Sequence, residues 1–299
     1  IGSNICNELI NKDLKFDLTF YKTKPITFSK KIRCIKLDLK NKKKVINVLK
    51  KYDTIIMCGG KIFNSRNKIN LIDDFNENVE IHLNVLSAVC KQKVKKYMWF
   101  SSCTGYPESK NKIDENDFFK DDPSYHKLPG WHSRFIEKVI ENYSKIFKTK
   151  FISIRVPEVY GQYDNYNLQT CRNIPLIIGK SYLGKKTNLE LNESFKKNYI
   201  YSKELAKLSL QVLWKSKKNY EIFNICDDKV YSLLDFVKLV NKNLGLKNEI
   251  FKKSKIKPKS IHRKFDNGKI KKFLKIKKIG NINNSIKQTL NWYSLLNKD

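Results

Sequence analysis

The sequence predicts an α/β protein with a doubly wound parallel sheet and a smaller lobe toward the C-terminus. Short apolar runs alternate with helical patterns through the first two-thirds of the 299 residues, as is typical of βαβ units. These runs lack the polar alternation of half-exposed strands, so we expect buried parallel strands. A chain of this length with 40% hydrophobic residues can bury a full core.

Five apolar runs are the candidate strands, in chain order Leu18–Tyr21, Cys34–Leu37, Thr54–Cys58, Tyr97–Phe100 and Phe151–Val156. Between the last two, apolar residues from Phe135 to Phe147 recur at helical spacing and predict a helix covering the sheet. A later helix begins after Ser232, whose hydroxyl can cap the amide near Asp235, and ends at Gly245. After Gly161 the alternation loosens, which favours a smaller, discontinuous lobe.

The formal net charge of +32 suggests a polyanionic partner, because nucleic acids and membrane surfaces attract such a charge. The lysines are spread along the chain, however, and the joint richness in Lys, Asn and Ile is typical of an AT-biased genome. We therefore expect neither a nucleic-acid nor a membrane partner. No apolar run reaches transmembrane length, so we expect a cytoplasmic protein. Seven scattered cysteines without a CxxC pair predict free thiols and no metal site.

Several small or polar residues come where a doubly wound sheet binds its ligand, at the carboxyl ends of strands. Ile1 and Gly2 resemble the end of a glycine-rich turn, so we expect a first strand and part of that turn to precede them. Asp38 and Leu39 end one strand run, and Cys58, Gly59 and Gly60 follow another.

Further motifs follow in a fixed order, namely NVEIHLNVLSAV, KKYMWFSSCTGYP, RVPEVYGQYDN, NYIYSKELAKLSLQVL, EIFNICDDKVYSLLDFV and TLNWYSLL. The ordered series resembles the extended short-chain dehydrogenases, specifically the NAD-dependent sugar epimerase/dehydratase family. The resemblance spans essentially the whole chain. It implies a Rossmann domain over residues 1–165 with a returning segment at about 197–226, and a substrate lobe over 166–196 and 227–299. Relatives commonly form homodimers through helices flanking the active site, so we expect a homodimer.

The resemblance also implies roles for single residues. Ser102 would hydrogen-bond the sugar hydroxyl that is oxidised, although a serine at a strand end can equally tie down a loop. The residues expected to contact the cofactor are Gly2, Asp38, Leu39, Cys58, Gly59, Gly60, Asn78, Ser101 and Arg134. The residues expected to contact the substrate are Ser102, Cys103, Thr104, Glu158 and Lys197.

The catalytic centre departs from the family, whose members carry a Tyr and a Lys four residues apart at a helix start. The cation lowers the pKa of the phenol so that the tyrosinate acts as a base. Here the segment reads PGWHSRFIEK and holds no such pair. Arg134 can still supply charge, and Tyr125 and His132 are the candidate acid/base residues. A histidine beside a helix start is more often solvated, which counts against His132.

Two other departures concern ligand choice. Phe20, Tyr21 and Lys22 stand where an acidic residue normally accepts the ribose hydroxyl of NAD, so NADP is at least as plausible as NAD. Glu158 stands where many relatives have an Asn that contacts the substrate, and Lys197 where many have an Arg that meets its diphosphate.

The sequence thus predicts an NAD(P)-dependent epimerase/dehydratase, or a reductase, that acts on a nucleotide-linked sugar through a transient ketone. Because the Tyr/Lys pair is absent, a catalytically silent NAD(P)-binding protein of the same fold is the alternative. A third reading, a polyanion-binding protein, rests on the net charge alone.

Overall fold

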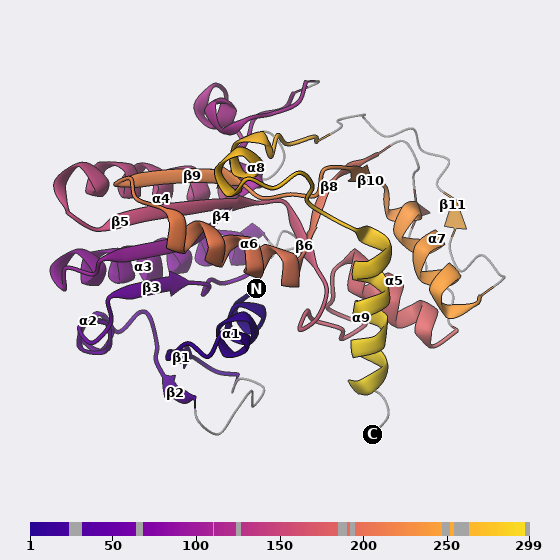
Figure 1. The fold of residues 1–299 in the computed structure, drawn as a ribbon, viewed down its shortest axis with the longest axis horizontal. Helices are drawn as coiled ribbons and strands as arrows, with labels where there is room; N and C mark the ends of the chain where they lie inside the picture. Colours follow the sequence, from indigo (N-terminus) through magenta and orange to yellow (C-terminus); the bar gives the residue numbers. More distant parts are fainter. Residues whose placement is uncertain are drawn as a thin grey trace. The chain divides into compact units, whose positions relative to one another are not determined.

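Four parallel strands form the main sheet of the first of two compact units (Figure 1). The computed structural model describes residues 1–23, 32–63, 68–109, 111–123, 127–184, 190–191, 195–246, 252–253 and 263–296. The first unit comprises residues 1–107, 114–156 and 206–224, and the second comprises residues 108–113, 157–205 and 225–299.

The main sheet has the order β3-β4-β5-β9, and its strands are β3 (Thr54–Met57), β4 (Lys96–Ser102), β5 (Lys150–Val156) and β9 (Tyr220–Asn224). Every neighbouring pair is parallel, so all four strands end at the same edge of the sheet. The parallel α/β architecture predicted from the alternating apolar runs is confirmed. The predicted strands at residues 54, 97 and 151 lie within one or two residues of their observed starts.

Helices cover both faces of this sheet. The first unit contains α1 (Gly2–Asn11), α2 (Lys42–Leu49), α3 (Lys68–Lys91), α4 (Lys127–Ile146) and most of α6 (Ser202–Lys215), with short 3-10 turns at Cys103–Gly105 and Glu115–Phe119. In Figure 1, α3 and α4 lie behind the sheet, where they pack against each other, and α4 also contacts β4 and β5. Helix α6 lies in front, and the Lys96 ammonium of β4 donates to the Leu213 carbonyl at 2.7 Å. Helices on both faces make the sheet doubly wound.

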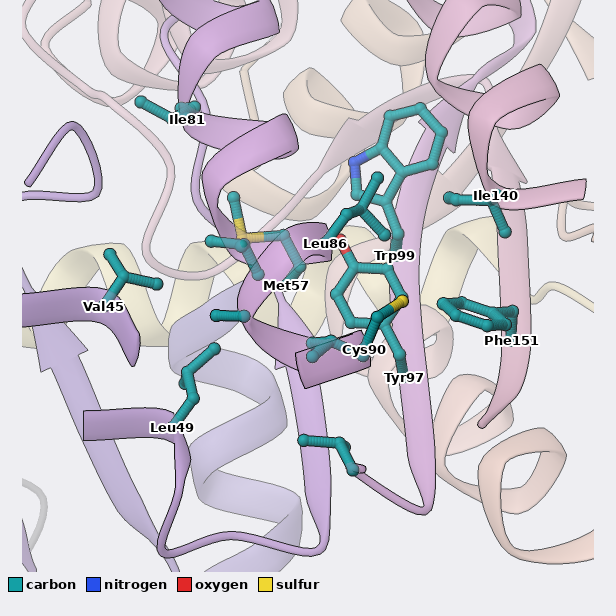
Figure 2. Close-up of a cluster of buried hydrophobic side chains, with 14 of the residues drawn as sticks. Val45, Leu49, Met57, Ile81, Leu86, Cys90, Tyr97, Trp99, Ile140 and Phe151 are labelled. Atoms are coloured by element: carbon teal, nitrogen blue, oxygen red, sulfur yellow. The ribbon is translucent and has the colours of Figure 1, made fainter. Parts of the chain in front are cut away.

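The core of the first unit is built around β4 and the helices behind it. Figure 2 shows Tyr97 and Trp99 of β4 between Leu86 of α3 and Ile140 of α4, and all four side chains are buried. These residues come from one face of the strand and from helical positions with the predicted apolar spacing.

The first two strands differ from the prediction. β1 (Asp17–Phe20) and β2 (Arg33–Lys36) pair in parallel, but they form a separate two-stranded sheet. We predicted buried strands here, and this is wrong, because Thr19 of β1 and Cys34 and Lys36 of β2 are exposed. A two-stranded sheet buries fewer side chains than the middle of a larger sheet. The apolar runs of β1 and β2 therefore predicted more burial than these strands have.

The second unit contains a three-stranded sheet of order β10-β8-β6, from β6 (Glu158–Tyr160), β8 (Lys197–Tyr201) and β10 (Val230–Tyr231). Its other elements are α5 (Asn173–Tyr182), α7 (Leu233–Leu244), α8 (Gly268–Leu274), α9 (Ile282–Leu296) and the short pair β7 (Glu190–Leu191) and β11 (Lys252–Lys253). Helix α7 packs against α5 and α9 over an aromatic core that includes Tyr199 and Phe236.

Helix α7 confirms the best-marked prediction of the sequence. The Ser232 hydroxyl accepts from the Asp235 amide at 3.2 Å, and the Asp235 carboxylate accepts from the Ser232 amide at 2.8 Å. Gly245 ends the helix in the left-handed conformation with φ 67°. Among the helices that the structure describes, none is long and apolar enough to cross a membrane.

Candidate functional site

Small residues from three separate segments meet at the carboxyl end of β3. A Cβ atom added to Gly2 would lie 3.4 Å from the Cβ of Cys58, and one added to Gly59 would lie 3.3 Å from Cδ1 of Leu39. Gly59 and Gly60 are exposed. We call these five residues, Gly2, Leu39, Cys58, Gly59 and Gly60, the β3 edge. All five were singled out for the cofactor from the sequence, and the structure places them side by side.

Asn78 of α3 fixes the loop that follows this edge. Its side-chain amide donates to the carbonyls of Lys61 and Asp74 at 3.0 and 2.7 Å, and its side-chain oxygen accepts from the Lys61 amide at 2.8 Å. The Lys61 ammonium in turn pairs with Asp74 and Glu77 at 3.0 Å each. Asn78 thus holds the backbone of Lys61, the residue that directly follows Gly60 of the β3 edge.

The loop after β2 is also fixed by α3. Asn84 donates to the carbonyls of Leu39 and Lys40 at 3.1 and 3.2 Å, and the Asp38 carboxylate accepts from the Lys40 amide at 3.0 Å. Asn84 was not among the site residues expected from the sequence. Its place in the NVEIHLNVLSAV motif, six residues after Asn78 on α3, was the available signal.

The β3 edge suits a dinucleotide phosphate. Its glycines expose backbone that any side chain would cover, and a Cβ at Gly59 would press on Leu39. Helix α1 begins beside it with no side-chain cap and no acidic residue in its first turn. Free amides at a helix start attract anions, so the residues present fit the pyrophosphate of NAD(P).

At the end of β4, Ser102 is arranged as a hydrogen-bond donor. Its hydroxyl oxygen accepts from the Thr104 amide at 3.1 Å and lies 2.9 Å from the Thr104 hydroxyl, which can donate to it. With these bonds directed at its oxygen, Ser102 keeps its own proton for another acceptor. The neighbouring Cys103 is buried.

Ser101 belongs to a buried ionic network instead. Its hydroxyl donates to Glu137 of α4 at 2.5 Å, and Glu137 pairs with Arg155 of β5 at 2.6 Å. Both charged side chains are only 1% exposed. Arg155 also donates to the Tyr106 hydroxyl at 2.9 Å, and Tyr106 donates to Asn224 at 2.6 Å. Glu137 was not among the residues predicted from the sequence, because a glutamate on a helix gives no sign of a partner on a strand.

Arg134 lies near the start of α4 and is buried. Its guanidinium donates to the Gly105 carbonyl at 2.7 Å and to the Asp121 carbonyl. The rings of Phe119 and Trp131 lie 5.8 and 5.3 Å from the guanidinium carbon. Arg134 therefore holds two backbone segments of the first unit together.

His132 is buried, contrary to the solvated position that we considered the more usual one. It is 5% exposed and lies among the rings of Phe63, Phe75, His82 and Trp99. Burial lowers its pKa to about 3. The sequence could not show this burial, because the enclosing rings come from α3, β4 and the loop after β3, which meet only in the folded chain.

His82 is the neighbour that sequence reasoning missed. Its Nδ1 donates to the Asn78 carbonyl at 2.6 Å, and its Nε2 accepts from the Trp99 indole at 2.9 Å. These bonds fix one neutral tautomer, and burial lowers the pKa of His82 to about 4. Neither histidine is thus charged at neutral pH.

At the start of α4 no Tyr/Lys pair stands four residues apart, because Gly130 precedes Arg134 by four residues and Pro129 precedes Ser133 by four. The Ser133 hydroxyl donates to the Pro129 carbonyl at 3.1 Å. Tyr125, the remaining candidate base, lies outside the described residues.

In the second unit the structure brings together the two charged residues expected to contact the substrate. Glu158 of β6 and Lys197 of β8 form an ion pair, and their side chains are 17% and 27% exposed. The Lys197 ammonium also lies 5.2 Å from the centre of the Tyr199 ring.

The comparisons with known proteins agree with one another. The family model described as NAD dependent epimerase/dehydratase matches residues 1–226. A GDP-L-fucose synthase from Dictyostelium discoideum is 27% identical over 248 residues, which are 79% of this chain and 75% of that protein.

Solved structures show the same fold. A UDP-glucose 4-epimerase from Thermotoga maritima with UDP-glucose has a TM-score of 0.86 at 15% identity, covering 99% of this chain and 96% of that one. A GDP-mannoheptose C4 reductase from Campylobacter jejuni with NADP has a TM-score of 0.79 at 21% identity, covering 98% and 94%. The predicted fold class, a Rossmann core with a C-terminal lobe, is confirmed.

Proposed function

The chain belongs to the NAD-dependent epimerase/dehydratase family, which acts on nucleotide sugars, and from this premise we propose that it is an NAD(P)-dependent epimerase/dehydratase or reductase of a nucleotide-linked sugar. When bound, NAD(P) would take a hydride from a sugar carbon or give one to it, so that the reaction passes through a transient ketone. The β3 edge would hold the pyrophosphate, and Asp38 with Leu39 would border the adenine.

The hydrogen bonding of Ser102 is the observation that carries this proposal. Its oxygen faces the Thr104 amide and hydroxyl, at 3.1 and 2.9 Å, so its own proton is available to a further acceptor. A sugar oxygen that gains negative charge as a carbonyl is reduced, or as a hydroxyl is oxidised, is such an acceptor. A fixed donor aimed at developing charge is a large source of rate enhancement. Thr104 would position Ser102, and Cys103 would support the same turn.

The proton must be moved by another group, and we propose Tyr125. His132 is less suited to this role, because its lowered pKa of about 3 leaves it a poor proton acceptor. Arg134 would act on the site by fixing the backbone of Gly105, three residues after Ser102.

A second candidate, a silent NAD(P)-binding protein, is favoured by a specific observation. Both Arg134 and His132 are withdrawn into the interior, and the segment PGWHSRFIEK holds no Tyr/Lys pair. The β3 edge requires none of these side chains. Cofactor binding would therefore survive without turnover.

The experiment that separates the two is a turnover screen with UDP- and GDP-linked sugars and both cofactors. For an active enzyme, we expect Ser102→Ala to lower kcat about a hundredfold, roughly 2.7 kcal/mol, with little change in Tm, since a positioned donor and no core contact is lost. Thr104→Val should lower kcat less.

Turnover unchanged by Ser102→Ala would contradict the mechanism. NAD(P) binding without turnover on any nucleotide sugar would establish the silent protein instead.

We further propose a homodimer through α3 and α4. Trp131 and Phe135 of α4 are 43% and 44% exposed, and Ile72 of α3 is 56% exposed, although all three are large and apolar. Such residues on two adjoining helices are typical of a protein interface. Sedimentation should give twice the 35.3 kDa of one chain, and Trp131→Lys should shift it toward the monomer.

A further inference from the structure

The ion pair of the second unit joins the first residues of two neighbouring strands. β6 and β8 run in parallel with Glu158 opposite Tyr199, and Lys197 precedes Tyr199 by two residues. Residues two apart on a strand share a face, so Lys197 is the diagonal neighbour of Glu158 on that face. The pairing thus follows from the strand register and does not require a particular loop conformation.

Both charges remain within reach of solvent, because the side chains are 27% and 17% exposed. An ion pair that water can still reach adds little to stability, since water screens it and two side chains must be ordered. The buried pair of Glu137 and Arg155 differs, because its charges are 1% exposed. Glu158 can therefore be displaced from Lys197 by a stronger anion.

A phosphate group is such an anion. It carries up to two charges and several acceptor oxygens, whereas a carboxylate carries one charge and two oxygens. On the face shared by Glu158, Lys197 and Tyr199, the ammonium of Lys197 is the group that would attract it. Glu158 neutralises this group in the structure.

We propose that Glu158 is an internal competitor for an anion site at Lys197, which lowers the affinity of the chain for nucleoside diphosphates. The choice of nucleoside diphosphates as ligands rests on the proposed function, whereas the competition by Glu158 rests on its ion pair with Lys197. The carboxylate takes the place of a phosphate oxygen, and the diphosphate binds when Glu158 leaves Lys197. Selectivity then shifts toward the uncharged parts of the ligand, because the phosphates contribute less to the affinity.

Calorimetric titration with UDP and GDP tests this, with uridine and guanosine as uncharged probes. Glu158→Gln removes the charge and keeps the shape, so we expect diphosphate affinity to rise about tenfold, roughly 1.4 kcal/mol. Nucleoside affinity should not change. The control Glu141→Gln alters the exposed carboxylate that pairs with Lys138 at 2.8 Å in the other unit, and should have no effect.

The gain should depend on Lys197. In the double variant Glu158→Gln/Lys197→Gln, diphosphates should bind no more tightly than in Lys197→Gln alone. If the double variant binds diphosphates more tightly than Lys197→Gln does, the proposal is overturned. It is also overturned if Glu158→Gln binds diphosphates no more tightly than the unaltered chain, or if neither of these two proteins binds them. Thermal melting of each variant verifies that it is folded.

NAD(P) binding, measured separately, distinguishes this proposal from the proposed function. If the unaltered chain binds NAD(P) and nucleotide sugars while Glu158→Gln gains nothing, the competition is wrong and the proposed function stands. If the chain binds neither NAD nor NADP but Glu158→Gln gains UDP affinity, the proposed function is wrong and the competition stands.

Discussion

The carboxyl end of β3 and the start of α4 present opposite kinds of chemistry. At the β3 edge, exposed glycines offer backbone, and distant residues such as Asn78 and Asn84 fix the loops. At the start of α4, side chains dominate, and the two that sequence reasoning singled out, His132 and Arg134, are buried.

Cofactor binding and proton transfer thus make separate demands on a site. A dinucleotide needs free amides and the absence of side chains, which glycines provide. A general base needs a titratable group with a pKa near the working pH and access to the substrate. The exposed glycines of the β3 edge suit the first demand, whereas His132 and Arg134 at the start of α4 are buried and do not satisfy the second.

The largest effect should come from breaking the ionic network behind α4. Glu137→Ala leaves the Arg155 charge buried and unpaired, so we expect a loss of about 3 to 5 kcal/mol in the free energy of unfolding. Urea denaturation measures this. The control Lys138→Ala removes an exposed partner of Glu141 and should cost less than about 0.5 kcal/mol. Equal losses in both variants would show that the α4 region is not held by this network.

Acid should destabilise the histidine pair. The pKa values of His82 and His132 are lowered by burial to about 4 and about 3, from the ordinary 6.5. Below pH 6.5 the unfolded chain takes up protons that the folded chain refuses, so stability is present above that pH and falls as the pH drops toward 4. Between pH 7 and 5.5 we expect a loss of about 2.5 kcal/mol from the pair.

Urea denaturation across this pH range provides the measurement. His132→Phe should keep the aromatic packing and roughly halve the slope of stability against pH. If the slope of stability against pH does not change in His132→Phe, His132 is protonated as readily in the folded chain as in the unfolded chain. The contrast between the β3 edge and the start of α4 would then be smaller.

The smallest effect concerns the β1 side of the cofactor region. Lys22 is exposed just after β1, where an acidic residue would accept the ribose hydroxyl of NAD. We expect the chain to prefer NADP and Lys22→Asp to shift the preference toward NAD about tenfold, roughly 1.4 kcal/mol. Fluorescence titrations with NADPH and NADH measure both affinities. The control is Lys12→Asp, which makes the same charge change at another exposed position. If it shifts the preference from NADP toward NAD by the same factor, the preference depends on net charge and not on Lys22.

Part of the candidate site could be placed on the sheet from the sequence because its signal is local. Gly59 and Gly60 directly follow an apolar strand, and Ser102 ends another, so the carboxyl edge of a parallel sheet assigns them a common place. Glu137 could not be found this way. Its partner Arg155 is 18 residues away on another element, and no local pattern distinguishes a buried glutamate from an exposed one on a helix.

By itself the sequence determined the parallel α/β architecture and the helix from Leu233 to Leu244, because periodicity and caps arise from neighbouring residues. The tertiary structure alone decided that β1 and β2 form their own sheet, that His132 is enclosed by aromatic rings, and that Lys197 meets Glu158. Hydrogen bonds between strands, burial and ion pairs depend on groups far apart in the chain, and these come together only when the elements pack.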